Sequence, residues 1–215
     1  MRLLASWRRV LAATVLSMAG ALVAAGCGTT EAGNAAVVGS EALSESQVVA
    51  YVQEINEITG APQDEPNAQQ VLIVVNRNVQ HDLVSQAAVD AGVVIPTAEV
   101  DAAYQQVLEA NGGEEQLNLA AAQQGIAPSM IKRDLETQLV ALELGQRISG
   151  ELSPEEQQQV LIRALGEFSE EIGVEVAPKY GQWSPVELSI APPENPVSKR
   201  VEPLVPDGAL QIPAQ

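Results

Sequence analysis

Apolar residues recur every three to four positions over most of the chain, and this spacing predicts a mainly α fold. Residues 96–149 are the centre of the pattern, because two long helical segments there flank a short one. Glycines or prolines separate the segments, and these residues commonly end or begin helices. The predicted helices cover residues 45–59, 67–91, 97–111, 114–124, 128–148 and 154–172.

The second of these segments leaves a choice open. Its run VLIVV, residues 71–75, is rich in β-branched residues, which favour strands, so the run alone could form a buried strand. Val71, Val75 and Val79, however, recur at helical spacing, and the segment is long and flanked by polar residues. These features favour a helix, which Gly92 is expected to end.

Short polar sequences indicate where several helices begin. Ser44 with Gln47, and Ser153 with Glu156, have the spacing of a capping box, in which two side chains satisfy the free backbone N–H groups of a helix start. Thr97 is expected to cap the helix that follows it. The stripe expected to face the core from the 128–148 helix comprises Ile131, Leu135, Leu139 and Leu142.

Two short segments predict a small β element that joins the ends of the domain. Residues 35–38 are an apolar run before a Gly-Ser turn, and residues 174–176 alternate apolar and polar. We expect the two to pair, because an isolated strand leaves its backbone groups unsatisfied. Residues 185–215 contain seven prolines and are expected to form an extended or disordered tail.

The first 26 residues have the pattern of a secretory signal, with three arginines before an apolar run. The sequence VAAGC, which ends at Cys27, resembles a bacterial lipobox, although Ala24 stands where Leu or Val is usual. The resemblance implies that Cys27 is lipidated and becomes the mature N-terminus, with residues 27–34 as a tether. Two acyl chains would anchor the protein stably at the extracytoplasmic side of the cell membrane. A plain signal with an incidental cysteine, or an uncleaved anchor, is the alternative.

The net charge of the chain limits the classes of partner that it can bind. Residues 1–26 contain three arginines and no acidic residue, so the rest of the chain has 8 basic and 28 acidic side chains and a net charge of −20. Such a charge repels nucleic acids and anionic lipid surfaces. We therefore expect no nucleic-acid partner, and membrane contact only through the lipid on Cys27.

Candidate chemistry is sparse. His81 is the only histidine, and a lone histidine on a polar helical surface is expected to be solvated. One His and one Cys cannot build a zinc site of His and Cys ligands, and lipidation of Cys27 would also remove a Cys–His pair. A Ser-His-Asp triad on His81 stays formally possible, but no nucleophile-elbow glycine pattern accompanies it. We expect no catalytic residue, metal or cofactor, and solvated positions for the acidic pairs at 114–115, 155–156 and 170–171.

Five stretches of the chain follow one another in a recognisable order: AVVGSEALSESQ (36–47), IPTAEVDAA (95–103), the segment from GG to QQG (112–125), IKRDLETQL (131–139) and KYGQW (179–183). Together with the order of the predicted elements, they resemble the N-terminal domain of the SurA family of extracytoplasmic chaperones, over residues 35–184. In that family a parvulin-type prolyl isomerase domain often follows the long helix. Here only Gly150-Glu151-Leu152 lies at that place, so we expect no isomerase domain and no enzymatic activity.

The resemblance implies binding of unfolded or newly exported polypeptides through an apolar groove. We expect the client surface between the 97–111 and 128–148 helices, with Tyr104, Leu108, Met130 and Leu139 as candidate contacts, or as ordinary core residues. Two other functions stay open. One is a scaffold or assembly lipoprotein that binds a specific folded partner, and the other is a small-ligand or enzyme site inside the helical core, for which the sequence offers no candidate residue.

Overall fold

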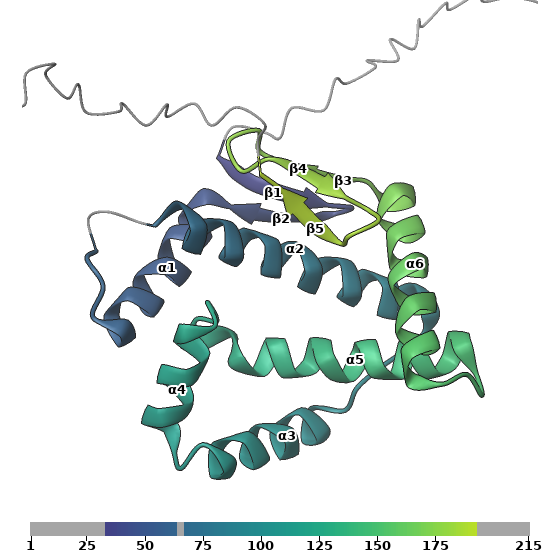
Figure 1. Cartoon of the computed structure of the whole chain (residues 1–215), viewed down its shortest axis with the longest axis horizontal. Helices are drawn as coiled ribbons and strands as arrows, with labels where there is room; N and C mark the ends of the chain where they lie inside the picture. The colour runs from purple at the N-terminus through teal and green to yellow at the C-terminus, as the bar shows by residue number, and fades with distance from the viewer. Residues whose placement is uncertain (1–32, 64–66, 193–215) are drawn as a thin grey trace, which may run out of the picture.

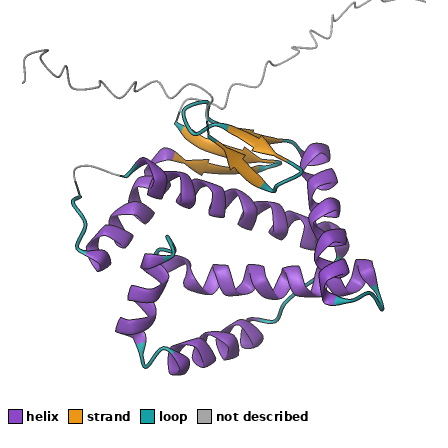
Figure 2. Ribbon diagram, viewed as in Figure 1, coloured by secondary structure: helices purple, strands orange, loops and turns teal. Residues whose placement is uncertain are grey.

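The computed structural model of the protein describes residues 33–63 and 67–192, and the fold is mainly α, as predicted (Figures 1 and 2). The VLIVV run is helical, because Val75, Val79 and Leu83 are fully buried along one face of its helix. The helices are α1 (Glu45–Thr59), α2 (Ala68–Ala91), α3 (Thr97–Ala110), α4 (Glu114–Gln123), the 3-10 turn η1 (Pro128–Met130), α5 (Ile131–Ser149) and α6 (Pro154–Ile172).

Helix α2 lies at the centre of the molecule. It packs against α1, α5 and α6, and the strands cover its opposite side (Figure 1). Helix α3 packs against α5 and α4 packs against α1, while α6 crosses the end of the α2–α5 pair (Figure 2). The hydrophobic core therefore gathers around α2, and the helix contributes nine of its residues to the buried interior.

The predicted pairing of the two ends of the domain is confirmed. Strand β1 (Asn34–Val38) pairs antiparallel with β3 (Val174–Val176), with Val38 opposite Val174. The sheet has a third strand, β2 (Glu41–Ser44), which was not predicted, so its order is β2-β1-β3. Gly39 makes the turn between β1 and β2 at a φ of +54°, a conformation that favours glycine.

The expected start of the tail at residue 185 is wrong. Strands β4 (Gln182–Ser184) and β5 (Ser189–Ala191) form a hairpin, and Ile190 is only 6% exposed. The hairpin is held on α2, because Asn76 accepts from the backbone N–H of Ile190 at 2.8 Å and Gln80 donates to the carbonyl of Leu188 at 2.7 Å. These contacts order residues 185–191, although the proline content of the segment predicted an extended or disordered tail. Residues 193–215 lie outside the described residues.

The helix starts agree with the sequence except at α3. Both capping boxes form, at Ser44 and at Ser153. Thr97 was expected to be an N-cap, but Pro96 holds that position without a side-chain hydrogen bond and Thr97 is the first helical residue. The predicted stripe of α5 is wrong at Leu142, which is 58% exposed, because α5 turns Val140 toward its neighbours instead.

The N-terminal predictions remain untested by the fold. The signal segment 1–26, Cys27 and the tether up to residue 32 lie outside the described residues. Among residues 33–63 and 67–192, no helix has the length and apolar character needed to cross a membrane.

Candidate binding sites and a buried ion-pair network

A buried network of polar side chains joins α2 to α5. Asp134 is 7% exposed, and its carboxylate accepts hydrogen bonds from Arg77 Nη1 at 2.5 Å, His81 Nε2 at 3.2 Å and Gln138 Nε2 at 2.7 Å. His81 is 3% exposed, so the expectation of a solvated histidine is wrong. The Asp134 carboxylate makes this burial possible, because a polar group is costly to bury without a hydrogen-bond partner.

The hydrogen bonds and charges of the network keep Asp134 ionised, so the network stabilises the contact between α2 and α5. Burial alone would raise the pKa of Asp134, but the hydrogen bonds from His81 and Arg77 and the charge of Arg77 outweigh it and lower the pKa to about 2. Since an ionised carboxylate only accepts, His81 Nε2 carries the proton between them. A carboxylate of such low pKa is a weak general base at neutral pH. His81 Nδ1 and Arg77 Nε have no hydrogen-bond partner among the described residues.

A second ion pair, between Asp82 on α2 and Arg133 on α5, stabilises the same helix–helix interface. Arg133 donates to Asp82 and, from Nη1, to the side-chain oxygen of Asn78 at 3.2 Å. Burial raises the pKa of Asp82 above its ordinary value, while the guanidinium of Arg133 opposes that rise. Asn78 is fully buried and also donates to the Val74 carbonyl at 2.8 Å. The two pairs together fix the register of α2 against α5.

A pocket of about 190 Å³ opens between α2, α5 and the segment that connects α2 to α3. We call it the α2–α5 pocket. Its polar wall includes Arg133 and Thr137, and Arg147 Nη1 supports the connecting segment by donating to the carbonyls of Ala91 and Gly92 at 3.3 Å each. Its apolar walls are Val84, Ala88, Val93 and Val140, and its rim residues Val89 and Val94 are 79% and 83% exposed.

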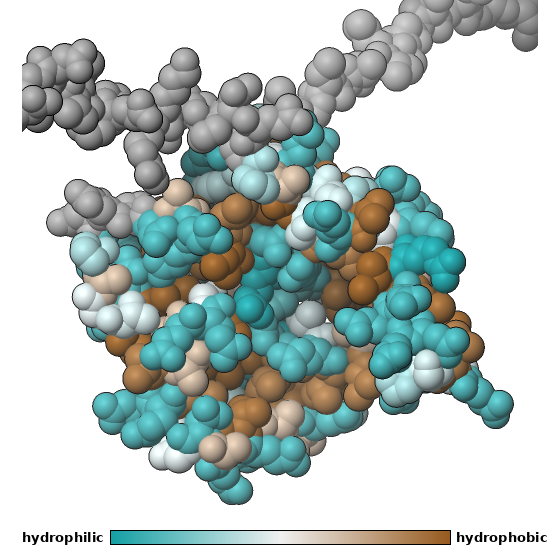
Figure 3. All heavy atoms as spheres, in the orientation of Figure 1, coloured by the Kyte–Doolittle hydropathy of each residue, from teal (hydrophilic) through white to brown (hydrophobic). Residues whose placement is uncertain are grey.

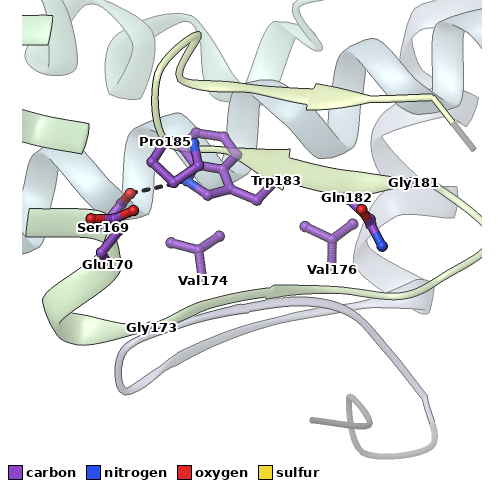
Figure 4. Close-up of a pocket in the computed structure, with 9 residues that line it drawn as sticks. All are labelled: Ser169, Glu170, Gly173, Val174, Val176, Gly181, Gln182, Trp183 and Pro185. Carbon is purple, nitrogen blue, oxygen red and sulfur yellow. Dashed lines mark hydrogen bonds between the residues drawn. The ribbon is translucent and has the colours of Figure 1, made fainter. Parts of the chain in front are cut away.

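A larger hollow of about 550 Å³ lies between β3, β4 and the end of α6. We call it the β3–β4 groove. In Figure 4, Val174 and Val176 stand on β3 and point toward Trp183 on β4, with Glu170 at one end of the groove and Gly181 at the other. Trp183 Nε1 donates to the Ser169 hydroxyl at 3.1 Å, which ties β4 to α6.

Gly181 closes one end of the β3–β4 groove. It has a φ of +121°, and a Cβ there would lie 1.9 Å from the carbonyl oxygen of Ala191 and 3.2 Å from Cα of Pro192. Only glycine allows this close approach of two backbones. The chain therefore leaves β5 beside the Gly181 end of the groove.

The four candidate client contacts occupy the α3–α5 side of the molecule. Tyr104 and Leu108 on α3 are half-buried and pack against the core, and Leu139 on α5 is half-buried. Met130 is only 3% exposed and belongs to the core cluster, so it offers almost no surface. Lys132 lies over the ring of Tyr104, with Nζ 5.1 Å from its centre. The two hollows that the structure does form were not identified from the sequence.

The spacing of α2 carried a signal for the buried network. Arg77 and His81 are four residues apart, and they flank Asn78 and Val79 on the face that meets α5. The sequence did not show that Asp134 would meet both, because that contact joins residues more than fifty positions apart. The acidic pairs at 114–115, 155–156 and 170–171 are exposed, as predicted.

The described residues carry a strong negative charge. Residues 33–63 and 67–192 contain 22 acidic and 6 basic side chains, and only Arg163 among the basic ones lacks an ion pair with a described residue. On the face shown in Figure 3, hydrophobic residues lie between hydrophilic ones instead of collecting in one broad patch. Such a net charge favours cationic partners.

No group of three or more His, Cys, Asp or Glu side chains in the described part of the chain is placed to hold a metal ion. Comparisons with protein-family models, with curated proteins and with solved structures found no match to this chain.

Proposed function

We propose that the protein is a lipid-anchored, extracytoplasmic chaperone-like protein that binds unfolded or newly exported polypeptides without catalysis. The observation that carries the proposal is the α2–α5 pocket, whose exposed rim valines lie beside its apolar walls. Exposed valines beside a pocket are unlike the isolated apolar side chains of an ordinary surface, because together they offer a concave apolar contact.

The binding energy of this apolar contact is small enough for a client to bind and leave again. Burying an aliphatic side chain yields about 1.5 to 3 kcal/mol, so Val89 and Val94 together contribute about 3 kcal/mol or more before ordering costs. A contact of that size permits release of the client. The net negative charge of the described residues favours client segments that combine apolar and basic residues.

The order of elements supports the same reading. It resembles a SurA-type N-terminal domain, and residues 150–153 connect α5 directly to α6 where that family often carries an isomerase domain. The ionised, fully engaged Asp134 beside the only histidine supports a role without acid–base catalysis.

The test is suppression of aggregation of a guanidine-unfolded client, followed by light scattering as the full chain is added in several-fold excess. We expect suppression by the wild type and a loss of more than tenfold in potency for the V89S/V94S variant, because about 3 kcal/mol of contact corresponds to roughly a hundredfold in affinity. The matched control is Val186→Ser, since Val186 is also 83% exposed but lies in the β4–β5 turn.

Two results would contradict the proposal. One is the absence of suppression by the wild type at that excess. The other is an equal loss in the double variant and the Val186→Ser control. Stoichiometric capture of one folded partner without any suppression would instead favour the scaffold function.

A further inference from the structure

The β3–β4 groove has an open strand edge along one side. The backbone N–H of Gly39 donates to the Gly173 carbonyl, and that of Ala177 donates to the Ala35 carbonyl. Hydrogen bonding toward a neighbour alternates along an antiparallel strand, so the backbone groups of Val174 and Val176 point away from β1. β3 and β4 belong to separate sheets, and no described strand pairs with that edge. An unpaired edge of this kind is a template for another strand.

The end of the β3–β4 groove opposite Gly181, beside the last turn of α6, has no cation among the described residues that line it. Glu170 and Glu171 lie in the last turn of α6, and that turn contains no basic residue. The C-terminus of a helix carries a partial negative charge, so two carboxylates there are unfavourable and a nearby Lys or Arg would be stabilising. Glu170 lines the groove itself and lies at its end (Figure 4).

The chain that continues beyond the described fold has a segment that matches both features. The residues after Pro192 read PENPVSKRVEP, and Val197–Glu202 is a stretch without proline that carries a β-branched valine near each end, Val197 and Val201. It contains Lys199 and Arg200, which are the only basic residues after Lys179. The preceding residues 193–196, Pro-Glu-Asn-Pro, are of types that favour turns.

We propose that Val197–Glu202 docks in the β3–β4 groove as an added strand, paired with the open edge of β3 and with its basic residues beside Glu170. The tail begins at the Gly181 end of the groove, where Pro192 lies against Gly181. On the proposed path, the turn-forming residues 193–196 reverse the chain direction there. The segment then runs toward the end of α6.

The dimensions agree with this path. A strand rises about 3.3 Å per residue, so Lys199 lies about 7 Å beyond Val197, which matches the two-residue span from Val176 to Val174. Its long side chain then reaches the last turn of α6. The inference does not depend on the proposed chaperone function, because it concerns a contact within one chain. If the groove also takes client segments, the tail competes with them for it.

The test is amide hydrogen exchange measured residue by residue on the full chain. We expect the Val174 and Val176 amides to exchange at least tenfold faster in K199E/R200E than in the wild type. The Glu175 amide is the internal reference, because Glu175 lies opposite Val37 of β1 and keeps that partner with or without the tail. Both substituted residues lie outside the described fold, so the fold should be retained.

A charge swap completes the experiment. Glu170→Lys alone should accelerate exchange at Val174 and Val176 in the same way, and combining it with K199E/R200E should restore the slow exchange. Equal exchange at Val174 in the wild type and in K199E/R200E would overturn the proposal. Protection that rises with protein concentration would also overturn it, because the strand would then come from a second copy of the chain.

Discussion

Removal of the charge at Asp134 is the sharpest test of the α2–α5 interface. The pKa of Asp134 falls from its ordinary value of 3.8 to about 2 in the folded protein. Each tenfold change in proton affinity corresponds to 1.36 kcal/mol, so the ionised carboxylate contributes about 2 kcal/mol to the free energy of unfolding. Because the folded pKa is depressed, this stability is fully present above pH 4 and is lost as the pH falls from about 4 to 2.

The variant Asp134→Asn keeps the shape of the side chain but leaves Arg77 half-buried without its counter-charge. Loss of one partner of a buried pair costs roughly 3 to 5 kcal/mol, and we expect the lower end at pH 7 because Arg77 is 28% exposed. Urea unfolding of both proteins at pH 7 and at pH 2 measures the difference directly. It should shrink by about 2 kcal/mol at pH 2, where the wild-type carboxyl is itself partly protonated.

A matched control separates burial from charge. Asp101→Asn removes the carboxylate of an ion pair with Lys132 in which both side chains are more than half exposed. Solvent screens such exposed pairs, so the loss should be small. A difference between wild type and Asp134→Asn that is the same at pH 7 and pH 2, or no larger than that of the control, would refute the reasoning.

Three further changes have defined outcomes. Ser153→Ala removes the capping box of α6 and should lower the free energy of unfolding by about 1 kcal/mol in urea titrations. Gly181→Ala forces a methyl group into the Ala191 carbonyl, so it should lower the melting temperature far more than Gly60→Ala, where nothing lies within 4 Å and only backbone strain of about 1 kcal/mol is added. Trp183→Phe removes the hydrogen bond to Ser169 and should lower the free energy of unfolding by about 1 kcal/mol. Because Ser169→Ala removes the same bond, the double variant should lose less than the sum of the two single losses.

Long amphipathic segments were the most predictable part of the fold. The spacing of Val71, Val75 and Val79 identified α2 as a helix despite its β-branched content, because the period continues well beyond the length of an ordinary strand. The caps at Ser44 and Ser153 were equally readable, since a capping box is a local interaction between residues three positions apart. Local rules suffice where the interaction itself is local.

Short strands were less predictable because their stability comes from distant partners. Strand β2 has four residues and forms only because β1 lies beside it, and β5 is held by Asn76 and Gln80 of α2. A proline-rich segment has no local preference for such a hairpin. The β1–β3 pair was predicted because each was the natural partner for the other at opposite ends of the domain.

The sequence by itself determined the helical class, most helix boundaries, the acidic surface and the absence of recognisable catalytic motifs. Periodicity, caps and net charge are properties of neighbouring residues or of their sum. The tertiary structure alone decided that His81 is buried, that Asp134 joins it to Arg77, and that two hollows lie beside α5 and β3. Those features need residues far apart in the chain to meet, and only the packing of the helices and strands brings them together.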